Sequence, residues 1–348
     1  MKPNFMFRSF KKTFAFVGLL AIAGNSIAQQ DKHFSMFAES PVYLNPATAG
    51  FAPGKMQLFT NYRMQWLTIS DNPYNTISAS ADGRLFDNGN NFLGVGVNFY
   101  NDVAGDAQFK TNEITVPINY ALSVGKTHRI ALGLQPSWYS RTIASSSLTW
   151  DNQWNGVAFD QAIPSYETVY SQNINLSKFD VAAGFHWYGT FKKNWKISLG
   201  LAGHHLTKPR INFYTDDDRL FRKLVLHGQF TYRQENSNLS VIPAFYGFIQ
   251  GPNKELTLGS NFRYVLRGAS RVTGYFNEMA INFGVYYRVG DAAIANIMFD
   301  ISGMTIGAAY DANISSLSPA SNGVGGFEVF LRWRLQFGNK GLGNPSIQ

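Results

Sequence analysis

Two adjacent histidines and a run of three aspartates are the side chains in this sequence best suited to hold a divalent cation. His204 and His205 stand at the end of a strand-like segment, and Asp216, Asp217 and Asp218 follow in the next connection. Imidazole and carboxylate are common ligands of zinc, and carboxylates also bind calcium. Three consecutive aspartates match no metal-loop spacing, however, so solvated loop charges are the better interpretation. The sequence predicts no metal site.

Covalent catalysis would need an activated nucleophile, and the residue types for it are poorly represented. The chain has no cysteine, which excludes disulfides, Cys-ligated metals and a lipid anchor on an N-terminal Cys. None of its serines stands in a nucleophile motif that pairs with a histidine. We therefore predict a protein that is not an enzyme, with no catalytic residue and no cofactor.

Charged side chains alternate with apolar ones in the late segments of the chain, and this is the strongest chemical pattern. In residues 327–337 the apolar side chains fall on one face, and only Phe330 breaks the alternation. In a soluble core such charges would be costly without partners, whereas a transmembrane barrel places them in a polar lumen. Two interpretations stay open: an ion-pair network that braces the wall, or a charged gate or peptide-docking surface. The residues of this predicted lumenal charge network are Arg263, Arg288, Glu328, Arg332 and Arg334, to which a family resemblance described below adds one aspartate.

Composition and alternation together indicate the elements that must position these charges. Charged residues make up 15% of the chain, against roughly 25% in soluble domains, and aromatic residues also make up 15%. Alternation recurs from about Met56 to Phe337, with many inward glycines that suit a crowded or plugged interior. We predict an all-β, transmembrane antiparallel up-and-down β-barrel of about 14 strands. The strands are expected to begin near residues 57, 75, 92, 113, 128, 179, 195, 223, 239, 255, 279, 292, 303 and 326.

The N-terminus has the organisation of an export signal. A basic stretch that contains Lys11 and Lys12 precedes a short apolar run, and small residues end at Ala28, so cleavage is expected before Gln29. The predicted domains are a signal peptide (1–28), a periplasmic N-terminal segment or plug (29–55), the barrel (56–337) and a periplasmic C-terminal tail (338–348). Removing four basic residues lowers the net charge from +8 to 8 − 4 = +4, which does not favour nucleic acid as a partner.

Connection lengths predict the orientation of the barrel. Outer-membrane barrels have short periplasmic turns and long surface loops. The longest connections, 141–178, 207–222 and 313–325, follow odd-numbered strands, so both termini are expected to be periplasmic. The first of them is rich in aromatic residues, which suits a protein-binding surface or a loop folded inward as a plug. These candidate partner-binding residues are Trp150, Trp154, Phe159, Tyr166 and Tyr170.

Several short motifs, in order along nearly the whole chain, resemble the type IX secretion system membrane protein family named for PorP and SprF. The first is Tyr43-Leu44-Asn45-Pro46-Ala47-Thr48-Ala49-Gly50, followed by Tyr62-Arg63-Met64-Gln65-Trp66. Later come Tyr287-Arg288, Tyr310-Asp311 and Gly325-Gly326-Phe327-Glu328. The resemblance implies turn roles for Asn45-Pro46 and Gly50. It also implies that Asp311 and Glu328 are lumenal partners of Arg332 or Arg288.

The resemblance further implies an integral outer-membrane protein of a Bacteroidota bacterium that works with the type IX secretion or gliding machinery. The expected partners are the C-terminal domain of a secreted adhesin, type IX components or envelope lipoproteins, and outer-membrane lipid. The expected function is to help export the adhesin or hold it at the cell surface. The alternative is a passive outer-membrane channel for small or hydrophobic solutes.

Overall fold

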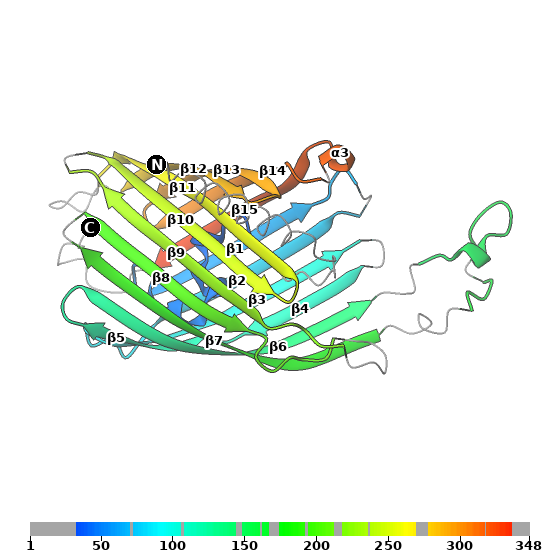
Figure 1. Cartoon of the computed structure of the whole chain (residues 1–348), viewed down its shortest axis with the longest axis horizontal. Coiled ribbons are helices and arrows are strands. Elements are labelled where there is room, and N and C mark those ends of the chain that lie inside the picture. The colour runs from blue at the N-terminus through cyan, green and yellow to red at the C-terminus, as the bar shows by residue number, and fades with distance from the viewer. Residues whose placement is uncertain are drawn as a thin grey trace, which may run out of the picture.

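A closed antiparallel sheet forms most of the computed structural model (Figure 1). The structure describes residues 33–69, 72–105, 108–143, 148–160, 162–166, 174–191, 194–211, 218–235, 237–268, 278–316 and 318–335. The expected signal peptide and C-terminal tail lie outside these residues. Within the described part of the chain, no helix is long and apolar enough to cross a membrane.

Strands that are neighbours in the sequence pair with each other, except β4 and β5, which both pair with β3 and β6, and the first strand also pairs with the last. The strands are β1 Met56–Gln65, β2 Tyr74–Leu85, β3 Phe92–Ala104, β4 Phe109–Thr115, β5 Ile118–Val124, β6 His128–Ile143, β7 Ile174–Phe191, β8 Trp195–His204, β9 Lys223–Arg233, β10 Leu239–Gln250, β11 Asn253–Arg267, β12 Met279–Arg288, β13 Ala292–Ile301, β14 Met304–Asn313 and β15 Val324–Leu335. Pairing of Met56 with Leu335 closes the ring.

β4 and β5 are one barrel strand interrupted at Pro117. Thr115 pairs with Asn98 and Ile118 pairs with Val95, so the register continues unchanged past the proline. Pro117 has no N–H to donate to the ladder, which breaks the regular pairing there. The barrel therefore has 14 strands, as predicted, and most of them begin within two residues of the expected position.

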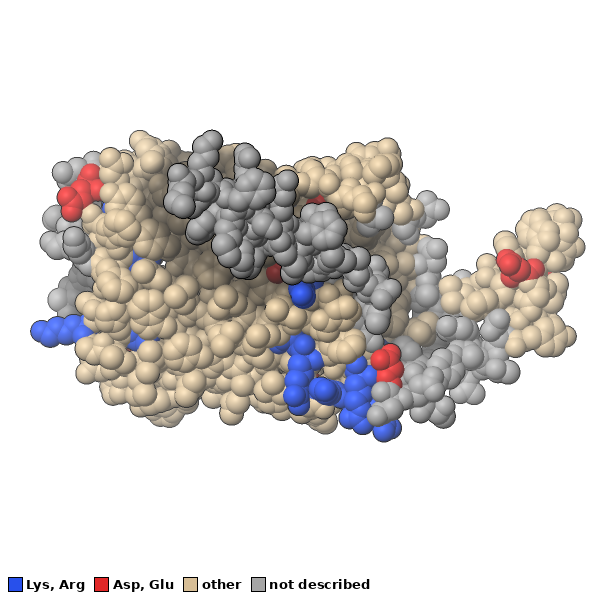
Figure 2. Space-filling model, viewed as in Figure 1, with Lys and Arg blue, Asp and Glu red and all other residues tan. Residues whose placement is uncertain are grey.

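In the last strand, the alternation of apolar and polar residues separates the outer face of the wall from the inner face. Trp333 of β15 is 48% exposed on the outside, whereas Glu328 is 1% exposed inside. Phe330, the exception to the pattern, also points inward and stacks on Phe59 of β1, with ring centroids 5.6 Å apart. The interior thus contains an apolar patch beside its charges, which explains why Phe330 breaks the alternation. The visible outer wall carries few charged residues (Figure 2), as a lipid-facing surface requires.

Residues 33–51, here called the lumenal segment, lie inside the ring of strands. They contain three short helical elements: 3-10 helices at Phe37–Glu39 and Pro46–Thr48, and α2 at Pro41–Leu44. Inward glycines make room for them. A Cβ at Gly133 of β6 would lie 2.6 Å from the backbone nitrogen of Ala47, which is too close for any side chain. Gly94, Gly184 and Gly200 likewise face the lumenal segment.

The two ends of the barrel differ. Met56 and Leu335 lie at what we call the turn end, where the connections 86–91, 125–127 and 302–303 are short. The opposite, loop end carries the connections 144–173, 205–222 and 314–323, the last with the short helix α3, Ser318–Ser321. The predicted connection 141–178 is too long, because Arg141 pairs with Leu176 in a ribbon that continues β6 and β7. Several connections depart from the length rule: 105–108, 251–252 and 289–291 at the loop end are short, and 268–278 at the turn end is long.

Candidate functional site

An arginine on β1 lies at the centre of a buried charge cluster near the loop end. Arg63 is 1% exposed. Its Nη1 lies 3.3 Å from Oε2 of Glu328, and its Nη2 lies 3.2 Å from Oδ2 of Asp311. Nη1 also donates to the hydroxyl of Ser35, at 2.8 Å. The guanidinium of Arg63 therefore contacts two carboxylates of the wall, one on β14 and one on β15, and one hydroxyl of the lumenal segment.

Glu328 fastens the start of the lumenal segment to the wall. Its Oε2 accepts a hydrogen bond from the backbone N–H of Ser35 at 2.8 Å, and its Oε1 accepts one from the N–H of Met36 at 3.0 Å. Asn61 of β1 also donates to Oε1, at 3.0 Å. Four donors, counting Arg63, thus converge on this one carboxylate, and charge-assisted hydrogen bonds of this kind are the stronger ones.

Arg288 of β12 extends the cluster along the inside of the wall, from β14 to β11. Its Nη2 lies 3.2 Å from Oδ2 of Asp311, its Nε lies 3.6 Å from Glu255 of β11, and its Nη1 lies 2.9 Å from Asp291. Nη2 also donates to the hydroxyl of Ser35, at 3.1 Å. This hydroxyl in turn donates to Asp311 at 2.6 Å, so it joins both arginines to one carboxylate.

The other predicted lumenal arginines lie nearer the turn end. Arg332 bonds to Glu39 of the lumenal segment. Arg263 pairs with Asp300, its Nε lying 2.9 Å from Oδ2, and also contacts Glu278. Arg332 and Arg263 therefore have carboxylate partners of their own, apart from the cluster around Arg63.

The structure thus divides the six predicted charges between two places. Arg288, Asp311 and Glu328 share one cluster, whereas Arg263, Arg332 and Arg334 lie toward the turn end. Asp311 is a partner of Arg288, but the partner of Arg332 is Glu39, from a segment that the sequence analysis did not connect with it. Sequence reasoning missed Arg63. It could have been found, because it shares the inward face of β1 with the polar residues Gln57 and Asn61.

Asn45 anchors the middle of the lumenal segment. It is fully buried, its Nδ2 donates to the carbonyl of Phe185 at 2.8 Å, and its Oδ1 accepts from the N–H of Ala47 at 2.9 Å. Nδ2 also lies 3.2 Å from Nε2 of His227. Because an amide nitrogen only donates, Nε2 of His227 is the acceptor and carries no proton. Asn45 therefore caps the Pro46–Thr48 helix and ties it to β7 and β9.

Two further contacts hold the segment against β2 and β3. The Tyr43 hydroxyl donates to the backbone carbonyls of Ala79 and Phe99, at 2.9 and 2.8 Å. Burial raises the pKa of this hydroxyl, so it remains a donor. Gly50 has a φ of 74°, a conformation that favours glycine, and its N–H donates to Asp82 at 2.8 Å.

The adjacent histidines take part in structural contacts. His204 Nε2 lies 2.9 Å from the carbonyl of Leu44, and His205 Nδ1 lies 2.6 Å from Oδ2 of Asp180. Asp216 and Asp217 fall outside the described residues. The part of the chain that the structure describes contains no group of three His, Asp or Glu side chains placed to bind a metal ion.

The aromatic connection between β6 and β7 extends away from the barrel at the loop end (Figure 1). The described residues of this connection include a 3-10 helix at Asp151–Gln153. Trp154 and Phe159 form an isolated β-bridge, and their ring centroids lie 5.1 Å apart. Trp154 and Phe159 are each 49% exposed, and Tyr166 is 83% exposed. Of the other predicted residues, Trp150 is half-buried and Tyr170 lies outside the described residues. We call residues 148–166 the aromatic arm.

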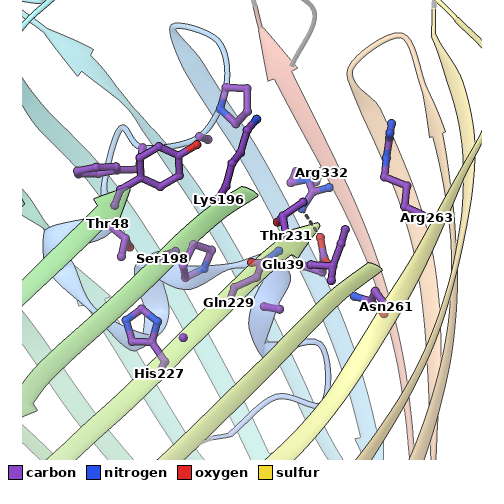
Figure 3. Close-up of a pocket in the computed structure, with 18 of the residues that line it drawn as sticks. Glu39, Thr48, Lys196, Ser198, His227, Gln229, Thr231, Asn261, Arg263 and Arg332 are labelled. Atoms are coloured by element: carbon purple, nitrogen blue, oxygen red, sulfur yellow. Dashed lines mark hydrogen bonds and ion pairs between the residues drawn. The ribbon is translucent and has the colours of Figure 1, made fainter. Parts of the chain in front are cut away.

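A cavity of about 340 Å³ separates the lumenal segment from part of the barrel wall (Figure 3). The lumenal segment contributes Phe37, Glu39 and Val42 to its lining. The wall contributes residues of β1, β2, β7 to β13 and β15, including Lys196, Arg233, Arg263, Arg332 and Arg334.

Comparison with known proteins gives one match in sequence and several in fold. The sequence profile of the type IX secretion system membrane protein PorP/SprF matches residues 26–333. No curated protein matches the chain. The toluene transporter TbuX of Ralstonia pickettii has a similar fold, with a TM-score of 0.48 and 12% identity over 86% of this chain and 94% of that one.

Two other solved barrels are similar at the same level. A FadL homologue of Pseudomonas aeruginosa has a TM-score of 0.46 and 10% identity over 85% of this chain and 94% of that one. Omp33 of Acinetobacter baumannii has a TM-score of 0.38 and 7% identity over 81% of this chain and 98% of that one. Similarities this low give no information about ligands.

Proposed function

Because the chain belongs to the type IX secretion system membrane protein family PorP/SprF, we propose that it binds a secreted surface adhesin through the adhesin's C-terminal domain. In this proposal the protein is a non-enzymatic barrel, integral to the outer membrane, and it helps export and display the adhesin. Residues 1–28 direct its own export and are cleaved before Gln29. The turn end faces the periplasm and the loop end faces outward.

The aromatic arm is the observation that carries this proposal. It extends beyond the rim of the barrel, and Trp154, Phe159 and Tyr166 leave large parts of their rings exposed. Exposed aromatic clusters are typical of protein-binding surfaces, because a rigid ring buries much apolar area on association. The 3-10 helix and the Trp154–Phe159 bridge give the arm local structure of its own.

The filled lumen also favours a scaffold over a transport path. The lumenal segment is fixed to β15 through Glu328, to β7 through Asn45 and to β2 through Tyr43. A segment held on several sides by buried hydrogen bonds is costly to displace. We therefore expect the barrel to present a fixed surface to its client.

Cell-surface display of the adhesin tests the proposal. The triple variant Trp154→Ser, Phe159→Ser, Tyr166→Ser should abolish retention of the adhesin but leave the amount of folded barrel unchanged. The matched control is Leu67→Ser, Ile69→Ser, Ile314→Ser, which removes exposed apolar side chains from other connections of the loop end. The control should retain the adhesin. Normal display in the arm variant would contradict the proposal.

The second candidate function is a passive channel for small or hydrophobic solutes, which the cavity beside the lumenal segment favours. The two functions predict different results when the purified protein is placed in a planar bilayer or in vesicles. A channel gives steady single-channel currents, or uptake of hydrophobic solutes into vesicles, whereas a filled scaffold gives neither.

A further inference from the structure

We propose that the turn end of the barrel contains a binding site for an acidic peptide segment, built from Lys196, Arg233 and Arg334. The site is separate from the aromatic arm and lies at the opposite end of the barrel. The proposal does not depend on the function proposed for the arm.

The space for this ligand is the 340 Å³ cavity, which falls within the range of about 300–1,000 Å³ typical of ligand pockets. It reaches the turn end, because its lining includes Asn194 beside the β7–β8 turn, Arg233 at the end of β9 and Glu278 just before β12. Figure 3 shows Lys196 and Arg263 on the wall strands beside the lumenal segment.

The charges that line the cavity are not balanced within it. Of the five cations, Arg332 is paired with Glu39, and Arg263 is paired with Asp300 and Glu278. The remaining carboxylate in the lining, Asp82, accepts a hydrogen bond from Gly50.

The other three cations of the lining, Lys196, Arg233 and Arg334, have no ion pair with any residue that the structure describes. The Nε of Arg334 is buried and has no hydrogen-bond partner in the described part of the protein. Arg334 as a whole is half-buried. A buried N–H of a guanidinium is costly to leave without a partner, and a carboxylate is the partner that matches the geometry of the group.

The positions of these cations indicate a chain of carboxylates instead of a single small anion. Lys196 of β8 pairs with Thr231 of β9, two residues before Arg233, so these two cations are diagonal neighbours on one wall. Arg334 lies on β15, which β10 to β14 separate from β9 in the sheet. An extended peptide, which advances about 3.3 Å per residue, can run along the cavity from one place to the other.

The lumenal segment supplies an apolar surface opposite the cations. Ala38, Pro41 and Phe51 of this segment line the same cavity and are partly exposed. Apolar side chains between the acidic ones would pack on these residues. The site therefore fits a peptide in which Asp or Glu alternates with apolar residues, as a segment of a periplasmic partner can provide.

Fluorescence anisotropy with the full-length protein in detergent tests the site. The probe is a labelled octapeptide that alternates Glu and Leu, and the comparison peptide alternates Gln and Leu. The variant Lys196→Gln, Arg233→Gln, Arg334→Gln should weaken binding of the Glu peptide by ~10-fold or more, because it removes three charge-assisted contacts. The Gln peptide should bind weakly to both proteins.

The matched control is Lys208→Gln, Arg210→Gln, Arg222→Gln, which removes the same net charge from exposed positions at the loop end. It should bind the Glu peptide as the parent does. Equal weakening by the two triple variants would overturn the site, because binding would then follow net charge alone. Displacement of the peptide by millimolar inorganic phosphate at moderate salt would overturn the peptide assignment in favour of a small-anion site.

Discussion

Replacing Glu328 by Gln should release the lumenal segment. The replacement keeps the size of the side chain but removes its charge, and it turns one of two acceptor oxygens into a donor. In the parent protein each carboxylate oxygen of Glu328 accepts hydrogen bonds from two donors: Met36 and Asn61 at Oε1, Ser35 and Arg63 at Oε2. In the variant, the amide NH₂ of the glutamine replaces one of these oxygens. The two donors that pointed at that oxygen then face another donor.

The size of the effect follows from the burial of this cluster. Removing one partner of a buried ion pair typically costs about 3–5 kcal/mol. Arg63 keeps Asp311 as a partner in the variant, so the lower end of this range, about 3 kcal/mol, applies. At about 1.4 kcal/mol per factor of ten, the population with a displaced lumenal segment should rise roughly 100-fold.

Thiol labelling measures this population directly, because the chain has no cysteine of its own. Val42, which is 1% exposed, is changed to Cys as the reporter. When the segment opens and closes faster than it is labelled, the labelling rate follows the open population. Glu328→Gln should therefore raise the labelling rate of Cys-substituted position 42 by about two orders of magnitude.

Glu278→Gln is the control for this experiment. Glu278 contacts Arg263, and its ion pair involves no residue of the lumenal segment. Labelling should stay within a few-fold of the parent rate in this control. Unchanged labelling in Glu328→Gln would refute the reasoning, as would an equal rise in both variants.

Two further predictions concern the same segment and use the same labelling assay. Asn45→Ala removes a buried hydrogen bond to the Phe185 carbonyl and the cap of the Pro46–Thr48 helix. It should destabilise the closed position of the segment by about 1–3 kcal/mol and so raise the labelling rate roughly 5- to 100-fold. Gly133→Ala places a Cβ against backbone atoms of Ala47 and should displace the segment from β6, whereas Gly203→Ala, whose Cβ meets only a side-chain atom of Leu206, should not. Equal labelling of the two glycine variants would contradict the packing described for Ala47.

The sequence was sufficient to predict the barrel, because alternation is a local property of each strand. The inward charges of β15 and the starts of β6, β8 and β9 could be located in this way. The extension of β6 and β7 past the expected ends was missed, because it depends on pairing between two segments outside the alternating core.

The contacts of the lumenal segment could not be predicted in the same way. Ser35 and Glu328 are 293 residues apart in the chain, and no local pattern connects them. The pairing of Arg332 with Glu39 is equally non-local, and the sequence offered Asp311 and Glu328 as alternatives of the correct charge. The glycines that face the segment did indicate a crowded interior, because small inward residues leave room for another chain.

The most direct test of the proposed function is a pull-down of the tagged protein from native outer membranes in mild detergent, followed by mass spectrometry. The parent protein should recover a large surface protein through the C-terminal domain of that surface protein. The control Leu67→Ser, Ile69→Ser, Ile314→Ser should recover it equally well, and Trp154→Ser, Phe159→Ser, Tyr166→Ser should lose it. Recovery of the surface protein by the arm variant at the parent level, or by none of the three proteins, would contradict the account.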